Sequence, residues 1–109
     1  MIRAYELMVI VDSGLDDEVT DAQVTRVAEL IAQRGGEVRR EDRWGLRRFA
    51  YEINHKHDGF YVVFEFVGGG DLDQLERALR LADQVVRHKL LRLPDSEAAR
   101  RGLLEPATS

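Results

Sequence analysis

Residues 37–67 read EVRREDRWGLRRFAYEINHKHDGFYVVFEFV, and this stretch decides the fold. Two segments with alternating apolar residues flank the polar turn at 54–59, which predicts a long β-hairpin. The apolar parity changes once within the first segment, because Val38, Trp44 and Leu46 alternate on one face and Phe49, Tyr51 and Ile53 on the other. One extra residue near positions 45–48 would restore a single face, so we predict a β-bulge there, at the glycine that bulges favour.

One strand and one helix are predicted on each side of the hairpin. Residues 2–11 alternate with apolar side chains on both faces, as expected of a central strand. A helix follows and ends near residue 33 or 34; either Asp16 or a capping box of Thr20 and Gln23 starts it. Leu72, Leu75 and Leu79 have helical spacing, and residues 84–93 form a last strand. The chain after Pro94 is polar and aperiodic.

The resulting order is strand, helix, strand, strand, helix, strand. Right-handed crossovers fold this order into an α+β, ferredoxin-like split βαβ sandwich, a four-stranded antiparallel sheet with two helices on one face. We expect one domain over residues 1–93 and a flexible or partner-ordered tail over 94–109. Phe60, Phe64 and Phe66 are assigned to the helix side, which leaves the open face to Glu6, Met8, Tyr61, Val63 and Glu65.

Composition excludes several classes of protein. The 109 residues contain no cysteine, so disulfides, thiolate chemistry and Cys-based zinc sites are excluded. No signal peptide or membrane span is recognised, and we expect a cytoplasmic protein. The net charge of −4 argues against nucleic-acid binding, yet residues 37–57 hold six Arg or Lys against four acids, and residues 85–109 hold five against three. Local basic clusters can therefore still contact phosphates, although charged edge strands also serve to prevent aggregation.

No catalytic, cofactor or metal constellation is recognised. His55, His57 and Asp58 lie close together in a polar turn, but they lack a further ligand at metal-site spacing and are interpreted as surface residues. The third strand lacks the basic and aromatic residues of an RNA-recognition motif, so sequence reading by stacked bases is not expected. We predict neither enzymatic activity nor a cofactor.

The chain resembles the bacterial small-subunit ribosomal protein numbered six. The specific part is the segment WGLRRFAYEI at 44–53, similar to a Gly-x-basic-x-Leu-Ala-Tyr-x-Ile signature. Tyr5-Glu6, Gly35-Gly36, Gly59-Phe60-Tyr61 and Val86-Arg87-His88 fall in register, and the match covers about residues 2–92. Phe49 and Glu52 depart from the usual leucine and proline. Some relatives carry an acidic tail, whereas this tail contains Arg100 and Arg101.

The resemblance implies a ribosome-bound structural component, which pairs with the small-subunit ribosomal protein numbered eighteen and with it binds the central domain of the small-subunit ribosomal RNA. A basic partner would supply part of the positive field that an acidic chain lacks. Arg47 and Arg48 are expected to contact RNA from the signature, whereas charge and placement suggest the others: Arg3, Tyr5, Lys56, Arg87 and His88. The expected contacts to the partner protein are Met8, Trp44, Tyr61, Val63 and Leu91.

A second hypothesis is a ferredoxin-like regulatory or enzymatic domain that binds a small molecule. It would require a concave apolar pocket with converging polar groups. Tight homodimerisation and stabilisation by a ligand would distinguish it from a ribosomal protein, which should cosediment with small subunits in low salt.

Overall fold

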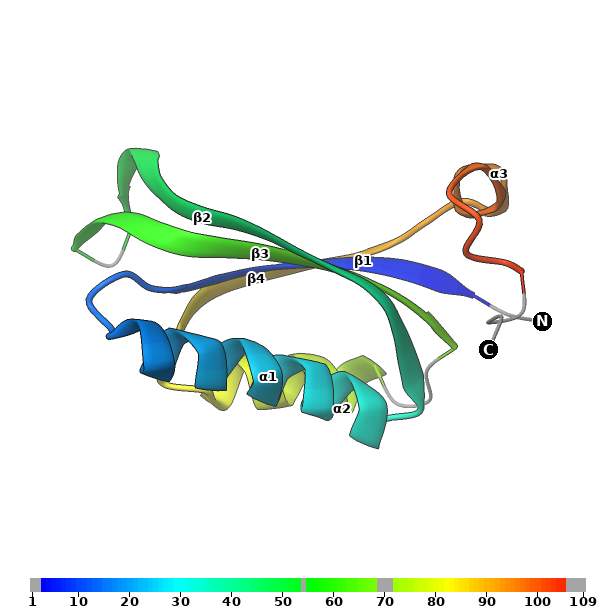
Figure 1. Cartoon of the computed structure of the whole chain (residues 1–109), viewed down its shortest axis with the longest axis horizontal. Coiled ribbons are helices and arrows are strands. Elements are labelled where there is room, and N and C mark those ends of the chain that lie inside the picture. Colours follow the sequence, from blue (N-terminus) through cyan, green and yellow to red (C-terminus); the bar gives the residue numbers. More distant parts are fainter. Residues whose placement is uncertain (1–2, 54, 69–71, 106–109) are drawn as a thin grey trace.

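The computed structural model describes residues 3–53, 55–68 and 72–105. One four-stranded antiparallel sheet carries two helices on one face (Figure 1), which confirms the predicted ferredoxin-like fold. The elements in chain order are β1 (Ala4–Asp12), α1 (Asp17–Gln33), β2 (Gly36–Ile53), β3 (Lys56–Gly68), α2 (Leu72–Leu81), β4 (Val85–Arg92) and α3 (Asp95–Arg100).

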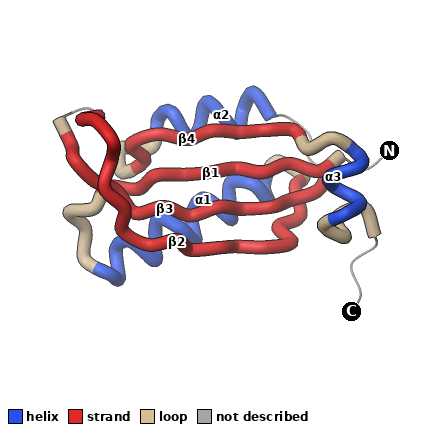
Figure 2. Tube along the Cα trace, turned by 90° about the horizontal axis from the view of Figure 1, so that it is seen from above, coloured by secondary structure: helices blue, strands red, loops and turns tan. Residues whose placement is uncertain are grey.

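The sheet order is β2-β3-β1-β4, so β1 and β3 are central and β2 and β4 are edges (Figure 2). Apolar side chains of β1 and β3 alternate onto the helix side, where Leu7, Val9, Phe64 and Phe66 are almost completely buried. They meet Val24, Val27 and Ile31 of α1 and Leu75 and Leu79 of α2. This single layer of apolar contacts between sheet and helices is the main core, as the sequence periodicity predicted.

The first helix begins at Asp17 with Asp16 as its N-cap, and the amide of Thr20 donates to the Asp16 carbonyl at 2.8 Å. Thr20 is therefore inside the helix and does not cap it. Of the two predicted starts, the one at Asp16 is confirmed.

The hairpin contains the predicted bulge and two further irregularities. The register of β2 against β3 shifts between Arg43 and Gly45, and Gly45 has φ +87°. Additional shifts lie between Val38 and Arg40 and between Arg48 and Ile53. Because bulges bend a strand, β2 curls at its far end, above the open face of the sheet (Figure 1).

Residues 94–105 differ from the expected tail. Residues 95–100 form α3, and Ala98 and Leu103 are buried with Ala4, Val67 and Leu93 in a second, smaller apolar cluster. The periodicity of the sequence could not reveal this packing, because the packing brings residues 98 and 103 against Ala4 of β1 and Val67 of β3. The domain boundary at residue 93 and partner-dependent ordering of the tail stay predictions.

Candidate functional site: the open sheet face and the basic flank

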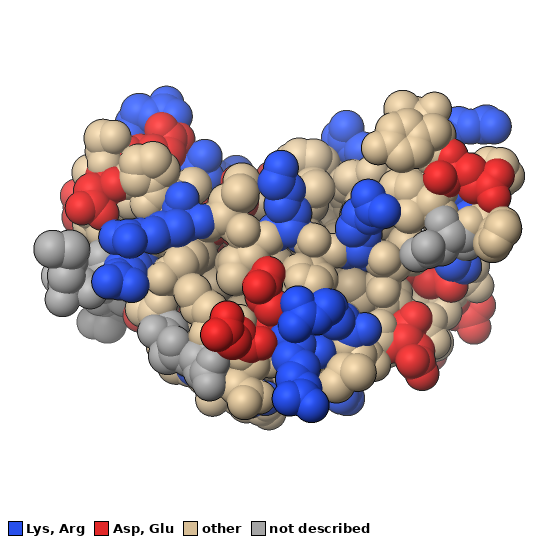
Figure 3. Space-filling model, turned by 180° about the vertical axis from the view of Figure 1, so that it is seen from behind, with Lys and Arg blue, Asp and Glu red and all other residues tan. Residues whose placement is uncertain are grey.

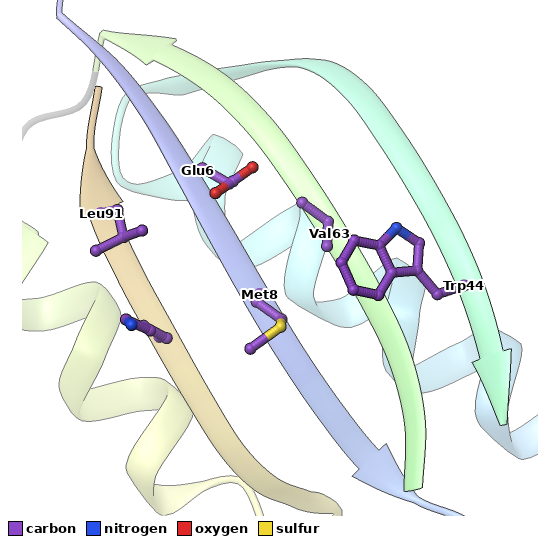
Figure 4. A pocket seen from close by; sticks show the side chains of 6 residues that line it. Glu6, Met8, Trp44, Val63 and Leu91 are labelled. Carbon is purple, nitrogen blue, oxygen red and sulfur yellow. The ribbon is translucent and has the colours of Figure 1, made fainter. Parts of the chain in front are cut away.

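The face of the sheet opposite α1 and α2 holds a shallow hollow. Glu6 and Met8 of β1, Val63 of β3 and Lys89 and Leu91 of β4 line it, and Trp44 leans in from β2 (Figure 4). The hollow measures about 190 Å³. The expected location of Glu6, Met8 and Val63 on the open face is confirmed, and four of the five residues expected to contact a partner protein meet in one place.

The fifth, Tyr61, lies beside Trp44 in an aromatic row at the curled end of β2. The Trp44 and Tyr61 rings are nearly parallel, with an interplanar angle of 4° and centroids 6.3 Å apart. The Tyr61 ring also contacts Phe49, with ring centroids 6.2 Å apart. The guanidinium of Arg47 sits 4.9 Å from the centre of the Trp44 ring. The row therefore presents Trp44, 44% exposed, and an arginine rather than an uncovered tyrosine face.

Gly59 permits the close packing at this end. A Cβ at position 59 would lie 2.4 Å from Cγ2 of Ile10 and 3.0 Å from the Phe49 ring. Only glycine fits there without displacing a side chain, so Ile10 and Phe49 can close over β3. This contact holds the curled part of the hairpin against the sheet.

Half of the hairpin's six cations are already neutralised within the chain. Arg39 pairs with Glu37, Arg43 with Asp21 of α1 and with Glu41, and Lys56 with Asp12 at 2.9 Å. Among the described residues, Arg40, Arg47 and Arg48 form no ion pair, and all three are exposed. The hairpin's capacity for phosphate is therefore smaller than its composition suggested.

Two residues expected to contact RNA face the interior instead. Tyr5 is 5% exposed and its ring stacks on Phe66 at 5.2 Å, so the expectation for Tyr5 is corrected. Its position on the helix side of a central strand explains the burial. His88 also points to the helix layer: its side chain is 13% exposed and its Nε2 lies 3.6 Å from a carboxylate oxygen of Glu76 on α2. A histidine in this position links β4 to α2 and is poorly placed to contact phosphate.

Exposed cations gather where β4 and α2 run side by side. We call this surface the basic flank; it consists of Arg77, Arg80, Arg87, Lys89 and Arg92, all exposed. None of them forms an ion pair with another residue described in the structure. Residues 72–92 hold these five cations against Asp73, Glu76 and Asp83, a local excess of positive charge in a chain of net charge −4. Figure 3 views this side and shows the Lys and Arg side chains over the strand and the helix below it.

The basic residues of the last strand were expected from the sequence, whereas Arg77 and Arg80 were not. A usable signal was present, because Leu72, Leu75 and Leu79 define the buried stripe of α2 and residues 77 and 80 fall on the opposite side. That the helix lies beside β4, and so adds its cations to those of the strand, follows from the tertiary fold alone.

The Asp12–Lys56 pair gives a pH-dependent prediction. The backbone N–H of Gly14 and the Lys56 ammonium both lower the pKa of Asp12 below its usual value. A carboxyl with a lowered folded pKa stabilises the fold above its unfolded pKa of about 3.9 and loses that contribution as pH falls through the folded value. We expect Asp12→Asn to cost about 0.2–1 kcal/mol at pH 7, the range for a partly exposed pair, and little below pH 3.

Urea unfolding of both proteins between pH 2.5 and pH 7 measures this difference. Asp16→Asn is a suitable control because Asp16 makes no side-chain capping hydrogen bond. A constant difference between the Asp12 variant and the parent across this range would contradict the expectation.

Within the described part of the chain, no three His, Cys, Asp or Glu side chains are grouped as metal ligands. The His55 side chain is fully solvated, the residue has φ 63°, and Nδ1 of its ring lies 3.2 Å from a carboxylate oxygen of Glu52. No described helix has the length and apolar character needed to cross a membrane.

The molecule is thus a small ferredoxin-like α+β protein with one sheet face that α1 and α2 leave open and with a cationic side. The family model for ribosomal protein S6 matches residues 4–92. The small ribosomal subunit protein bS6 of Carboxydothermus hydrogenoformans is 47% identical over 93 residues, covering 84% of this chain and 97% of the relative. The bS6 protein of Moorella thermoacetica is 39% identical over 95 residues, covering 86% and 97%.

A solved structure agrees with these relatives. The 30S ribosomal protein S6 of Thermotoga maritima superimposes with a TM-score of 0.85 at 32% identity, covering 96% of this chain and 100% of the other. The P2 domain of the chemotaxis kinase CheA, at 16% identity and a TM-score of 0.59, shares the fold alone. The chain belongs to the ribosomal protein S6 family. It is a component of the small ribosomal subunit in the bacterial cytoplasm, and its family is not a class of enzymes.

Proposed function

We propose that this chain binds the central domain of the small-subunit ribosomal RNA together with the ribosomal protein numbered eighteen, and so supports subunit assembly. The observation that carries the proposal is that a partly apolar hollow and a group of unpaired cations adjoin along β4, with Lys89 belonging to both. The open face is partly apolar and carries an open hollow, and the basic flank carries cations that no described residue neutralises.

The basic flank is suited to phosphate. Guanidinium groups form charge-assisted, bidentate hydrogen bonds with phosphate oxygens, and such contacts position a protein on RNA without reading its sequence. Arg87 is common to the flank and to the residues expected from the sequence, and Arg47 and Arg48 on the hairpin add a second group. Arg3 is exposed ahead of β1 and stays a predicted contact, whereas Lys56 would have to leave Asp12 to reach RNA.

The open face is suited to a protein partner. Met8, Val63 and Leu91 offer apolar area, and Trp44 is the kind of large aromatic residue that anchors interfaces. The hollow is below the roughly 300–1,000 Å³ of typical small-ligand sites, so the alternative of a ligand-binding domain is less well supported.

The test measures binding of the full chain to a central-domain RNA fragment, with and without the partner protein, across salt concentrations. We expect tighter binding with the partner and a log–log salt slope that becomes steeper by about 0.9 for each phosphate contact this chain adds to the partner's own. A complex of RNA and partner that binds with the same affinity and salt slope whether or not this chain is present would overturn the proposal.

A further inference from the structure

The C-terminal segment folds back onto the open face. After Leu93 the chain leaves the sheet, and α3 lies on the side opposite α1 and α2, across the end of the strands near the N-terminus (Figures 1 and 2). We call residues 95–105 the strap. It covers one end of the face that the proposed function assigns to the partner protein, and leaves the hollow beside Trp44 open.

Arg101 fastens the strap to the sheet. Its Nη1 donates to Oε2 of Glu65 at 2.7 Å and to Oε1 of Glu6 at 3.3 Å, while its Nε donates to Glu97 at 2.8 Å. The carboxylates of Glu97, Glu65 and Glu6 stabilise the guanidinium and raise the pKa of Arg101 above its ordinary value.

The two sheet carboxylates create a need for a cation. Glu6 and Glu65 are directly opposite each other on β1 and β3, and like charges in that position destabilise a sheet. The Glu65 side chain is only 12% exposed, which limits screening by water. Glu6 also lines the hollow, so the strap and any occupant of the open face share this residue.

The rest of the strap is held by contacts outside the main core. Leu103 and Ala98 pack with Ala4, Val67 and Leu93, and the carbonyl of Glu105 accepts a hydrogen bond from Arg39 at 3.0 Å. Gly102, with φ +74°, makes the turn that brings the Leu103 amide to the Ala98 carbonyl. Because this cluster is separate from the core between sheet and helices, the strap can leave without unpacking that core.

We propose that the strap is an autoinhibitory cover, and that Arg101 occupies the place of a basic side chain of the partner protein. The inference rests on the proposed function, since it concerns access to the same face. When the strap leaves the sheet, Glu6 and Glu65 lose the positive charge of Arg101. Displacement of the strap is therefore favourable only for a partner that brings a cation to these two carboxylates. The strap therefore favours a basic partner and disfavours neutral or acidic ones.

The opposite possibility is that the partner binds the strap and orders more of the tail. The two possibilities predict opposite changes in the affinity for the partner protein when the strap is released. Competition predicts tighter binding to the partner when the strap is released, whereas a contributing strap predicts weaker binding.

The experiment compares the full chain with Arg101→Ala and with a chain ending at residue 94, by calorimetric titration with the purified ribosomal protein numbered eighteen. We expect both variants to bind the partner several-fold more tightly than the parent. Arg100→Ala is the matched control, because Arg100 precedes Arg101 at the end of α3 and, among the described residues, pairs with Glu97 but with neither sheet carboxylate. A synthetic peptide of residues 94–109, added to the shortened chain, should restore weaker binding.

Unchanged or weaker binding by Arg101→Ala and by the shortened chain would overturn the strap proposal, provided circular dichroism shows that both remain folded. If the shortened chain does not fold, the comparison of Arg101→Ala with Arg100→Ala decides alone. Failure of the proposed function looks different: the parent and every variant would fail to bind the partner at all.

Discussion

Replacing Arg77, Arg80 and Arg87 together with glutamine is expected to weaken binding to the central-domain RNA fragment by roughly 10- to 150-fold. The three side chains are exposed and make no ion pair within the described structure, so they are free to contact phosphate. At about 0.5–1 kcal/mol for each exposed charged contact, the loss amounts to about 1.5–3 kcal/mol. The salt slope should fall by about 2.7, since each of the three phosphate contacts contributes about 0.9.

The matched control removes the same charge from three cations that the chain already neutralises, Arg39, Arg43 and Arg100. Filter binding or fluorescence anisotropy, in the presence of the partner protein and at several salt concentrations, measures both variants. Equal losses in the two variants would mean that net charge alone controls binding and that the basic flank is not a specific contact surface.

Leu79→Ala is expected to lower the free energy of unfolding by about 2–5 kcal/mol. Leu79 is completely buried between α2 and the sheet, and truncation removes its apolar contacts and leaves a cavity. In a domain of about 100 residues such a loss corresponds to a fall in Tm of about 10 °C or more.

The same helix provides the control. Leu81 is 72% exposed, two residues further along α2, so Leu81→Ala should change stability by no more than about 0.5 kcal/mol. Urea unfolding followed by circular dichroism measures both, with the midpoint changing and the m-value constant. Similar losses at the two positions would contradict the arrangement of α2 on the sheet.

The distribution of charge explains how an acidic chain can take part in a ribonucleoprotein. Acidic side chains neutralise cations on the hairpin and on the strap, whereas the Arg and Lys side chains of β4 and α2 form no ion pair with any residue that the structure describes. Because β4 borders both the hollow and the basic flank and Lys89 belongs to both, the proposed protein and RNA contacts are adjacent along this strand. Long-range attraction would then come from local potential and from a basic partner rather than from net charge.

Much of the fold could be predicted from residue patterns. The alternation of apolar residues in β1 and β3 assigned Phe64 and Phe66 to the core and Glu6 and Met8 to the open face, because side chains in a strand alternate between the two faces. Gly45 indicated the bulge because glycine readily adopts the positive φ found at such bulges. The hollow therefore consists largely of residues that could be chosen from sequence.

The function of the cations could not be predicted in this way. The pairs Lys56–Asp12 and Arg101–Glu6 join residues 44 and 95 positions apart, so a local pattern cannot show that these cations are occupied. The alternation along each strand already showed which face of the sheet Tyr5 and His88 share with their neighbours. Only the packing of α1 and α2 on that face shows that the two side chains are largely covered there.

The sequence by itself determined the order of elements, the main core and the side of the sheet that the two long helices leave open, because each depends on periodicity within one strand or helix. Only the tertiary structure decided which arginines remain free and that residues 95–105 cover one end of the open face. These properties depend on charges and apolar groups that meet across the sheet, and the distance between them is set by folding rather than by spacing along the chain.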